Sequence, residues 1–290
     1  MERFDGTGVA LVTPFDENLR IDEESLRRLV NHVIIGGVDF LVVLGTTAEC
    51  ATLSAAEKAQ VVRIVSEENQ GRLPIMVGIG GNNTAEVVRE IQQVDWIEKC
   101  QGILSITPFY NKPSQKGLLE HFKAVSAATQ LPLCLYNVPS RTGVNLHVDT
   151  IAQLMHECPN IKSLKEASGL LEQATAIVKQ KRADMTLFSG DDSIIMPLMA
   201  IGFDGVISVA ANVFPQQYSA LVKSMKNGQW SEAQRLHLEL SDFCRLLFAE
   251  GNPAGIKAAL HAAGIIRCNT LRLPLTPISE SLYEKLSSCF

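Results

Sequence analysis

Short apolar runs alternate with longer amphipathic stretches eight times before residue 226 of this 290-residue chain. The runs are rich in β-branched residues, most are too short for a buried helix, and several are bounded by Gly or Pro, so they predict strands. Their nearly continuous hydrophobicity is typical of parallel strands that are covered on both faces. The runs span residues 9–12, 40–44, 74–79, 102–107, 132–137, 161–165, 186–189 and 205–209.

The stretches between the runs carry the signals of amphipathic helices. Ser54 is followed three residues later by Glu57, which is a capping box, and Asp22 and Ser114 also precede apolar residues at helical spacing. Strands that alternate with helices predict a parallel sheet, and eight such units in a chain of this size favour a closed (β/α)8 TIM barrel over an open sheet. No G-x-G-x-x-G follows the first run, which further disfavours a dinucleotide-binding fold.

The pattern changes after the eighth unit. Helical segments then follow one another without a strand between them, at residues 231–248, 253–263 and 278–286. We therefore predict an α/β fold in which a catalytic (β/α)8 barrel at residues 1–225 carries a C-terminal helical appendage at residues 226–290.

Composition and charge exclude several classes of protein. Hydrophobic residues make up 46% of the chain and charged residues 20%, which is enough for a sizeable core. The net charge is −5 and Lys and Arg do not cluster, so we expect no nucleic-acid partner. We also expect no membrane helix and no signal peptide, because no apolar run has the required length or position. The seven cysteines form no C-x-x-C, which is typical of reduced thiols in a cytoplasmic protein.

Barrels of this class place the active site at the C-terminal ends of the strands, so the residues that end the apolar runs are the candidates. Lys165 ends the sixth run and lies in the barrel mouth if its side chain points inward. Loss of water there favours the neutral amine, which can attack the ketone of a small 2-oxo acid and form a Schiff base. A surface lysine at a strand end is the alternative. Lys162, which has the opposite parity in the same run, receives no role.

Hydroxyl and guanidinium groups lie at other strand ends. Tyr110 and Tyr136 follow or end the fourth and fifth runs, and either phenol could carry protons in a chain with the hydroxyl of Thr46. Aromatic side chains that only line the mouth are the alternative. Arg141, in the loop after the fifth run, suits a carboxylate by bidentate pairing. Thr47 could donate to a second carboxylate, although a helix-entry turn would also explain its position.

Two consecutive carboxylates, Asp191 and Asp192, follow the seventh run. Such a pair can bind a divalent metal, but neither a histidine nor a third carboxylate stands at ligand spacing. A helix N-cap is therefore the preferred interpretation. We expect an enzyme with no metal and no other cofactor.

Five segments together resemble the dihydrodipicolinate synthase family. Three of them are similar to its patterns G-T-T-G-E, Y-N-x-P-x-R-T-G and K-E-[AS]-[ST]-G. The resemblance extends over essentially the whole chain, in order and with similar spacing, so the segments are specific together although each is weak alone. They read GTTAE at 45–49, YNVPSRTG at 136–143, LKEASG at 164–169, SGDD at 189–192 and GVISV at 205–209.

The resemblance implies a class I aldolase reaction that condenses pyruvate with L-aspartate 4-semialdehyde in lysine and diaminopimelate biosynthesis. It implies Lys165 as the Schiff-base residue, with Tyr136 and Thr46 in the proton relay. Tyr110 would complete that relay in a neighbouring subunit, which implies at least a dimer, and family members are commonly tetramers built as dimers of dimers. The residues it assigns to substrate binding are Thr47 for the pyruvate carboxylate, Arg141 for the carboxylate of the semialdehyde, Gly190 and Ile207.

The chain departs from the family pattern at Ala48, where Gly is usual and φ and ψ are freer, and at Cys50, where Ser is common. A third departure concerns inhibition by lysine, which binds at a dimer interface in inhibited members. Positions that often carry His are Ala and Lys here, and a Tyr is replaced by Phe, so we expect weak or absent inhibition. The residues of this possible allosteric lysine site are Asn82, Glu86, Ala55, Lys58 and Phe109.

Two other functions compete with this interpretation. A related pyruvate-dependent aldolase, such as N-acetylneuraminate lyase or a keto-deoxy-sugar acid aldolase, would share Lys165 and Tyr136. The presence of Arg141, and of Thr46 where such enzymes carry Ser, favours the synthase. The other competitor is a barrel that binds a small acid without catalysis, which the retention of Lys165, Tyr110, Tyr136 and Arg141 disfavours.

Overall fold

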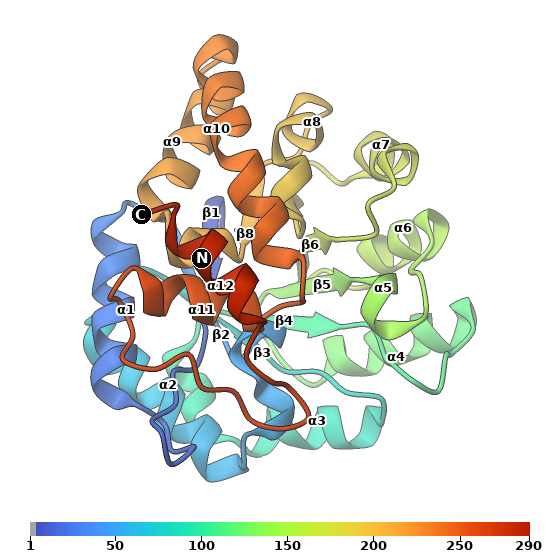
Figure 1. The fold of residues 1–290 in the computed structure, drawn as a ribbon. Coiled ribbons are helices and arrows are strands. Elements are labelled where there is room, and N and C mark those ends of the chain that lie inside the picture. The colour runs from blue at the N-terminus through green and yellow to red at the C-terminus, as the bar shows by residue number, and fades with distance from the viewer. Residues whose placement is uncertain (1–3) are drawn as a thin grey trace. The chain divides into compact units, whose positions relative to one another are not determined.

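Eight strands form a closed barrel in chain order, β1 to β8, in the computed structural model, which describes residues 4–290 (Figure 1). The strand pairs recorded within each part of the chain are parallel. The predicted TIM barrel is confirmed, and each predicted run overlaps one strand. The strands are β1 Gly6–Ala10, β2 Phe40–Val43, β3 Ile75–Gly78, β4 Gly102–Ile106, β5 Leu133–Asn137, β6 Ile161–Glu166, β7 Thr186–Ser189 and β8 Gly205–Ser208.

Only the first strand lies clearly away from its predicted run, because it begins with glycine and threonine in place of apolar residues. Gly8 pairs with Phe40 of β2, and a Cβ atom at Gly8 would lie 2.3 Å from the Phe40 ring. The ring therefore fills the space that a side chain at position 8 would take. A search for apolar runs does not find such a strand, because the apolar group at this position belongs to the neighbouring strand.

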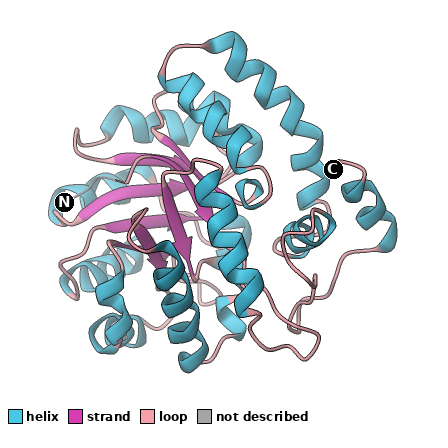
Figure 2. Ribbon diagram, turned by 90° about the vertical axis from the view of Figure 1, so that its left-hand side faces the viewer, coloured by secondary structure: helices cyan, strands magenta, loops and turns pink. Residues whose placement is uncertain are grey.

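Helices follow the strands (Figure 2) and begin where the capping signals indicate. The side chains of Asp22, Ser54 and Ser114 accept hydrogen bonds from the first turns of α1, α2 and α4, and Ser54 with Glu57 forms the predicted capping box. The first nine helices are α1 Glu23–Ile35, α2 Ala55–Asn69, α3 Thr84–Gln93, α4 Gln115–Ala127, α5 Pro139–Thr142, α6 Val148–Glu157, α7 Leu171–Gln180, α8 Ile195–Ala200 and α9 Pro215–Lys226.

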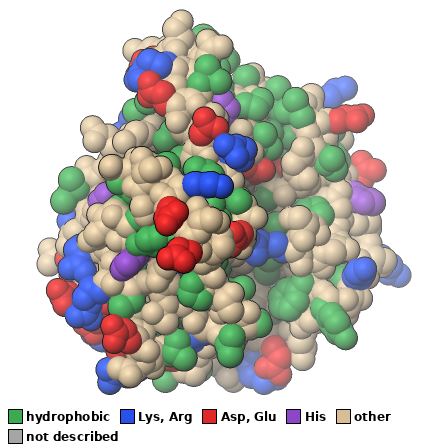
Figure 3. All heavy atoms as spheres, in the orientation of Figure 1, with side chains coloured by type: hydrophobic (Ala, Val, Ile, Leu, Met, Phe, Trp, Pro, Cys, Tyr) green, Lys and Arg blue, Asp and Glu red, His purple; other side chains and the backbone are tan. Residues whose placement is uncertain are grey.

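Three further helices form the predicted C-terminal helical region: α10 Trp230–Phe248, α11 Ala254–Ala262 and α12 Glu280–Ser287. The long helix α10 packs against α9, and α11 and α12 pack against α10 and against each other. None of the helices in residues 4–290 is long and apolar enough to cross a bilayer. Acidic and basic side chains lie among one another over the face seen in Figure 3.

Contacts divide the chain into two compact units. The first unit contains Met76–Ile207 together with Phe4 and Asp5, and it holds β4 to β7 entire. The second unit contains Gly6–Ile75 and Ser208–Phe290. The C-terminal helices therefore belong to the same unit as β1, β2 and the turn after β2. A domain boundary between residues 225 and 226 stays a prediction.

Candidate active site

Lys165 and Tyr136 lie side by side on neighbouring strands of the first unit. β5 and β6 pair in parallel with Tyr136 opposite Lys165, so both side chains leave the same face of the sheet. The Nζ atom of Lys165 lies 4.4 Å from the centroid of the Tyr136 ring. Lys165 is only 5% exposed, which excludes the surface lysine considered above. An amine and a phenol at this separation can act on the same substrate carbonyl.

No second nucleophile competes with Lys165 from the neighbouring position on β5. Cys134 precedes Tyr136 by two residues and so faces the same side. It is fully buried, and burial raises the pKa of its thiol to about 12. The thiol therefore stays protonated and serves as a small apolar side chain.

Gly190 leaves the space that the Lys165 side chain fills. A Cβ atom at position 190 would lie 3.0 Å from Cε of Lys165 and 2.7 Å from Cβ of Ala167. Ser189 pairs with Val206 across β7 and β8, so Ile207 follows on β8 at the level of Gly190, and it is buried. The structure thus brings Gly190 next to Lys165 and places Ile207 on the next strand.

A buried polar network lies on the opposite face of the same two strands. Asn137 pairs with Glu166 in the register, and its Nδ2 atom donates to Glu166 Oε2 at 3.0 Å and to Asn145 Oδ1 at 2.8 Å. The backbone N–H of Ser168 donates to Glu166 Oε1 at 2.7 Å. Burial raises the pKa of the Glu166 carboxyl, although these hydrogen bonds act in the other direction. This network was not predicted from the sequence, since only the parity of Asn137 and Glu166 could have indicated that they face away from Lys165.

The loops that carry Tyr110 and Arg141 are joined through Thr142. The backbone N–H of Tyr110 donates to the Thr142 carbonyl at 3.4 Å, and the hydroxyl of Thr107, just after β4, donates to Thr142 Oγ1 at 3.3 Å. Arg141 lies in the short helix α5 and is exposed. Tyr110 is 87% exposed and has a φ of +72°, a conformation that is uncommon outside glycine. The structure therefore places the Tyr110 phenol outside the buried site of its own chain.

Thr46 and Thr47 lie in the second unit, in a single 3-10 turn, Thr46–Ala48, that follows β2. Thr46 is half-buried, whereas Thr47 is buried and its Oγ1 accepts a hydrogen bond of 3.0 Å from Nδ2 of Asn252. Asn252 lies in the link between α10 and α11, so the C-terminal region contacts this turn directly. Asn252 was not predicted from the sequence, because nothing in the chain around it indicates a partner far away.

The turn is also held by a buried ion pair. Lys257, on α11, forms an ion pair with Glu49, and both side chains are fully buried. Glu49 Oε2 also accepts a hydrogen bond of 3.0 Å from the backbone N–H of Arg272. Nζ of Lys257 lies 4.0 Å from the centroid of the Phe15 ring and donates to the Thr270 carbonyl at 2.9 Å. Burial lowers the pKa of Lys257 to about 8, although Glu49 acts to raise it.

The alanine in place of the usual glycine is accommodated within this turn. The left-handed conformations fall on the flanking Leu44, with a φ of +57°, and on Glu49, with a φ of +54°. Ala48 lies inside the 3-10 turn and is buried. A glycine is therefore not required at position 48. Cys50 opens the next 3-10 turn, Cys50–Thr52, and is half-buried.

The predicted N-cap at the aspartate pair is confirmed. Asp191 Oδ1 accepts hydrogen bonds from the backbone N–H of Ser193 at 2.9 Å and from its hydroxyl at 2.6 Å. In the part of the chain that the structure describes, no group of three His, Cys, Asp or Glu side chains could hold a metal ion.

The residues of the possible lysine site fall in both units. In the first unit, Asn82 Nδ2 donates to the Phe109 carbonyl at 3.1 Å, and Glu86 forms an ion pair of 2.8 Å with Arg89. Ala55 and Lys58 lie in the first turn of α2, in the second unit. The structure brings Asn82 and Phe109 together, while Glu86 is already engaged within its own helix.

Comparisons with known proteins agree with one another. The model of the dihydrodipicolinate synthetase family matches residues 3–290. The 4-hydroxy-tetrahydrodipicolinate synthase of Parabacteroides distasonis is 46% identical over 97% of this chain and 94% of its own length. A dihydrodipicolinate synthase crystal structure from Thermotoga maritima has a TM-score of 0.95 and 38% identity, and covers 99% of this chain and 98% of that one. The chloride-inhibited dihydrodipicolinate synthase of Acinetobacter baumannii, solved with pyruvate, has a TM-score of 0.94 and 38% identity, with 98% and 97% covered.

Proposed function

The chain belongs to the dihydrodipicolinate synthetase family, and from this premise we propose how its residues condense pyruvate with L-aspartate 4-semialdehyde. The activity is that of a 4-hydroxy-tetrahydrodipicolinate synthase, a lyase of lysine and diaminopimelate biosynthesis, the function for which its relatives are named. Their likeness covers nearly the full length of both chains. The assignment of individual residues is our proposal.

The observation that carries the mechanism is the buried Lys165 amine 4.4 Å from the Tyr136 ring. The neutral amine adds to the ketone of pyruvate, and Tyr136 delivers the proton with which the carbinolamine hydroxyl leaves as water. The resulting iminium returns a methyl proton to the Tyr136 phenolate and becomes an enamine. The enamine carbon attacks the aldehyde of the second substrate, and Tyr136 protonates the alkoxide that forms. The amino group of the semialdehyde then adds to the iminium carbon and displaces the Lys165 amine. The pyruvate in the Acinetobacter baumannii structure supports the choice of first substrate.

The remaining roles follow the family pattern. Thr46 passes protons to and from Tyr136, Thr47 donates to the pyruvate carboxylate, and Arg141 binds the carboxylate of the semialdehyde. The exposure of Arg141 supports a role in capturing a substrate from water. Gly190 and Ile207 complete the site: the glycine gives the lysine room, and the buried isoleucine supplies an apolar wall.

Tyr110 serves a neighbouring copy of the chain in this proposal. Its exposure and positive φ support that role, because a positive φ at a residue other than glycine costs free energy and such strain clusters at functional sites. Leu170 and Leu171, at the start of α7, are about half exposed beside an open cavity and could form a second contact between copies, as a dimer of dimers requires. Sedimentation of the protein should then give a mass above that of one chain. A monomer that retains full activity would overturn the role of Tyr110.

The function is tested by supplying pyruvate and aspartate semialdehyde and following the product through a coupled reductase. Lys165→Ala should abolish the rate and also prevent borohydride from trapping pyruvate on the protein. Lys162→Ala is the matched control, because Lys162 lies on the same strand but its side chain is 44% exposed and pairs with Asp184 at 2.6 Å. It should keep the wild-type rate. Trapping of pyruvate without any condensation would favour a sugar-acid aldolase, and absence of trapping would favour a non-catalytic protein.

Tyr136→Phe keeps the ring beside Lys165 but removes the phenol proton. A positioned acid–base group contributes about 10²- to 10⁴-fold, so kcat should fall by that factor. Trapping of pyruvate should become slow but stay complete, since the amine is still present. A wild-type rate of trapping would remove Tyr136 from the proton relay.

We propose weak or absent inhibition by lysine and a cytoplasmic location. The loss of the phenol hydroxyl at Phe109 and the engagement of Glu86 with Arg89 support the first proposal. The seven cysteines, all free thiols, support the second. Half-inhibition at sub-millimolar lysine would contradict the first, and secretion of the protein would contradict the second.

A further inference from the structure

Asn252 contacts a side chain of the proposed pyruvate site from outside the barrel strands. Its Nδ2 atom donates to Oγ1 of Thr47 at 3.0 Å, across most of the length of the chain. Thr47 is buried, at 3% exposure, so bulk water does not readily replace this contact. The residue thus acts on the Thr47 hydroxyl itself and not only on the backbone of the turn.

The direction of this hydrogen bond determines what the Thr47 hydroxyl can do next. A hydroxyl has one hydrogen to donate, and its oxygen can also accept. An amide NH2 group only donates, so Thr47 Oγ1 must accept from Asn252. The hydroxyl hydrogen of Thr47 is then left for another acceptor. A carboxylate is such an acceptor, because it has oxygen lone pairs and no hydrogen when it is ionised.

The C-terminal region that carries Asn252 is held to the turn by neighbouring contacts. Lys257, a short distance further on in α11, forms the buried ion pair with Glu49, which lies just after Thr47. Glu49 is also bound by the backbone N–H of Arg272. The C-terminal region therefore holds the turn at two places, one at the Thr47 hydroxyl and one at Glu49. A turn that is fixed in this manner presents its hydroxyl without a loss of freedom on binding.

We propose that Asn252 is a positioning residue that holds the Thr47 hydroxyl as a hydrogen-bond donor for the carboxylate of pyruvate. This inference rests on the proposed function of Thr47. It assigns to the C-terminal helical region a part in substrate recognition, and it explains why a buried threonine hydroxyl can favour an acid over a neutral ketone.

The direct test is Asn252→Asp, which has nearly the same shape but reverses the hydrogen bond. The aspartate would accept the Thr47 hydrogen and would repel a second carboxylate. The half-saturating pyruvate concentration in borohydride trapping should rise about 30-fold or more, because both an attraction is lost and a repulsion gained. Asn252→Ala, which leaves the hydroxyl free to turn, should raise it only about 3- to 10-fold. In both variants kcat at saturating pyruvate should stay within about twofold of wild type, since Lys165 and Tyr136 are untouched.

Two controls separate positioning from a general effect of charge or folding. Asn227→Asp introduces the same charge at an exposed position just after α9, and it should leave the half-saturating concentration unchanged. In a Thr47→Ala background, Asn252→Asp should lose the part of its effect that acts through the hydroxyl, so that the double variant binds pyruvate more tightly than additivity predicts. Thr47→Ser keeps a hydroxyl and should restore the full sensitivity to Asn252→Asp.

The outcomes distinguish this inference from the proposed function. If pyruvate is trapped on the wild-type protein but Asn252→Asp and Asn252→Ala both bind it within about twofold of wild type, Asn252 has no positioning role. The same conclusion follows if Asn252→Asp costs as much in Thr47→Ala as in the wild-type chain. If the wild-type protein itself traps no pyruvate, the proposed function and this inference both fail.

Discussion

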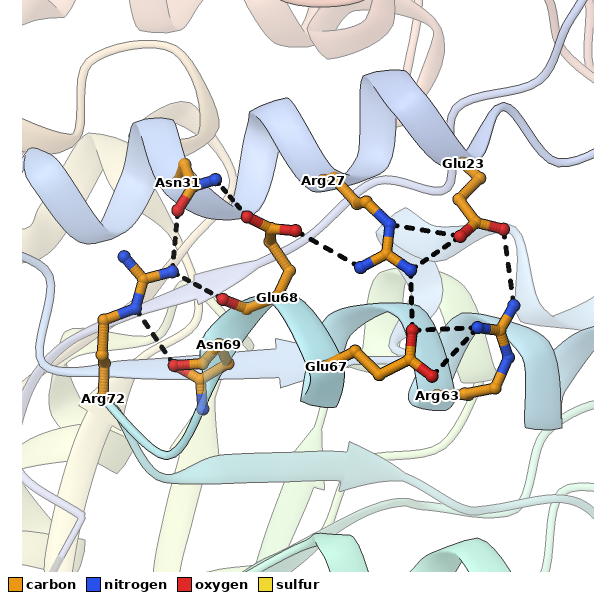
Figure 4. Close-up of polar contacts among 8 residues, drawn as sticks. All are labelled: Glu23, Arg27, Asn31, Arg63, Glu67, Glu68, Asn69 and Arg72. Atoms are coloured by element: carbon orange, nitrogen blue, oxygen red, sulfur yellow. Dashed lines mark hydrogen bonds and ion pairs between the residues drawn. The ribbon is translucent and has the colours of Figure 1, made fainter.

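Two groups of charged residues in the second unit stabilise it in different ways. The first, which we call the α1–α2 cluster, joins the two helices on the surface through Glu23, Arg27, Arg63, Glu67 and Glu68 (Figure 4). The second is the buried pair, Glu49 and Lys257. In the cluster Arg63 is 46% exposed, whereas both members of the buried pair are at 0%.

Screening by solvent and the presence of several partners make the α1–α2 cluster tolerant of substitutions. Arg27 contacts three glutamates, so the loss of any one of them leaves it paired. Water and salt also screen each pair, so an exposed pair typically contributes less than about 1 kcal/mol. The buried pair is shielded from water, which therefore does not screen it. Removal of one member leaves a buried charge without its ion-pair partner.

Ion pairs thus contribute differently at the surface and in the interior of this protein. The α1–α2 cluster adds a little stability along a helix pair that packs in any case through its apolar faces. The buried pair joins segments that are distant in the sequence and fixes the turn that presents Thr47. Changes in the two groups should therefore differ both in size and in their effect on pyruvate binding.

Lys257→Met should have the largest effect, because it leaves the Glu49 carboxylate buried without its cation. We expect a loss of about 3–5 kcal/mol in the free energy of unfolding, measured by urea denaturation. A second change, Glu49→Gln, should recover much of that loss in the double variant, since the glutamine still accepts the Arg272 N–H and carries no charge. A loss below about 1 kcal/mol in Lys257→Met would show that the buried pair contributes no more to stability than an exposed pair does.

Glu57→Gln should have an intermediate, pH-dependent effect. Arg272 holds the pKa of the Glu57 carboxyl at about 2, below its ordinary value of 4.5. The folded state therefore binds this proton less tightly than the unfolded state. The stability that Glu57 contributes is present above pH 4.5 and is lost as the pH falls from about 4.5 towards 2.

We expect Glu57→Gln to cost about 1–2 kcal/mol near neutral pH, with allowance for the partial exposure of the pair. The cost should shrink in urea denaturation at progressively lower pH. A cost that is constant over that range would show that the carboxyl charge is not responsible. Glu86→Gln, an exposed partner of Arg89, is the matched control and should change little at any pH.

Arg63→Met should have the smallest effect, about 0.2–1 kcal/mol, because Glu67 keeps its contact with Arg27. The difference from wild type should vanish at about 1 M salt, where screening acts over only about 3 Å. Lys257→Met measured in the same salt should keep its full cost. If salt rescued both variants equally, the distinction between an exposed and a buried group would be wrong.

The architecture of the chain was readable in its sequence because it depends on local patterns. Eight apolar runs that alternate with amphipathic helical stretches leave few alternatives to a barrel, and the runs overlap all eight strands. The first strand was the least well placed, since its residues 6–8 are glycine and threonine and the Phe40 ring fills the space of a side chain at Gly8. Local patterns cannot show a contact with a residue that arrives later in the chain.

The candidate site was predictable to a similar extent. Lys165, Tyr136 and Gly190 were identified from strand ends and from the family resemblance, and the register of β5 and β6 brings the first two together. Asn137 and Glu166 were missed, although they lie beside those residues in the sequence. Their network could be recognised only from the strand parity and from the side chains that contact one another on the face of the sheet opposite to Lys165.

Residues within a few positions of one another specify the order of strands and helices, the helix caps and the residue types at the strand ends. The partners of each side chain depend on the tertiary structure. The sequence around Asn252 does not distinguish it from other polar residues, and only the fold brings its amide to the Thr47 hydroxyl. In the same way, only the fold buries Lys257 of α11 against Glu49. The physical reason is that hydrogen-bond direction and desolvation belong to pairs of groups in space, and the sequence specifies such pairs only through the completed fold.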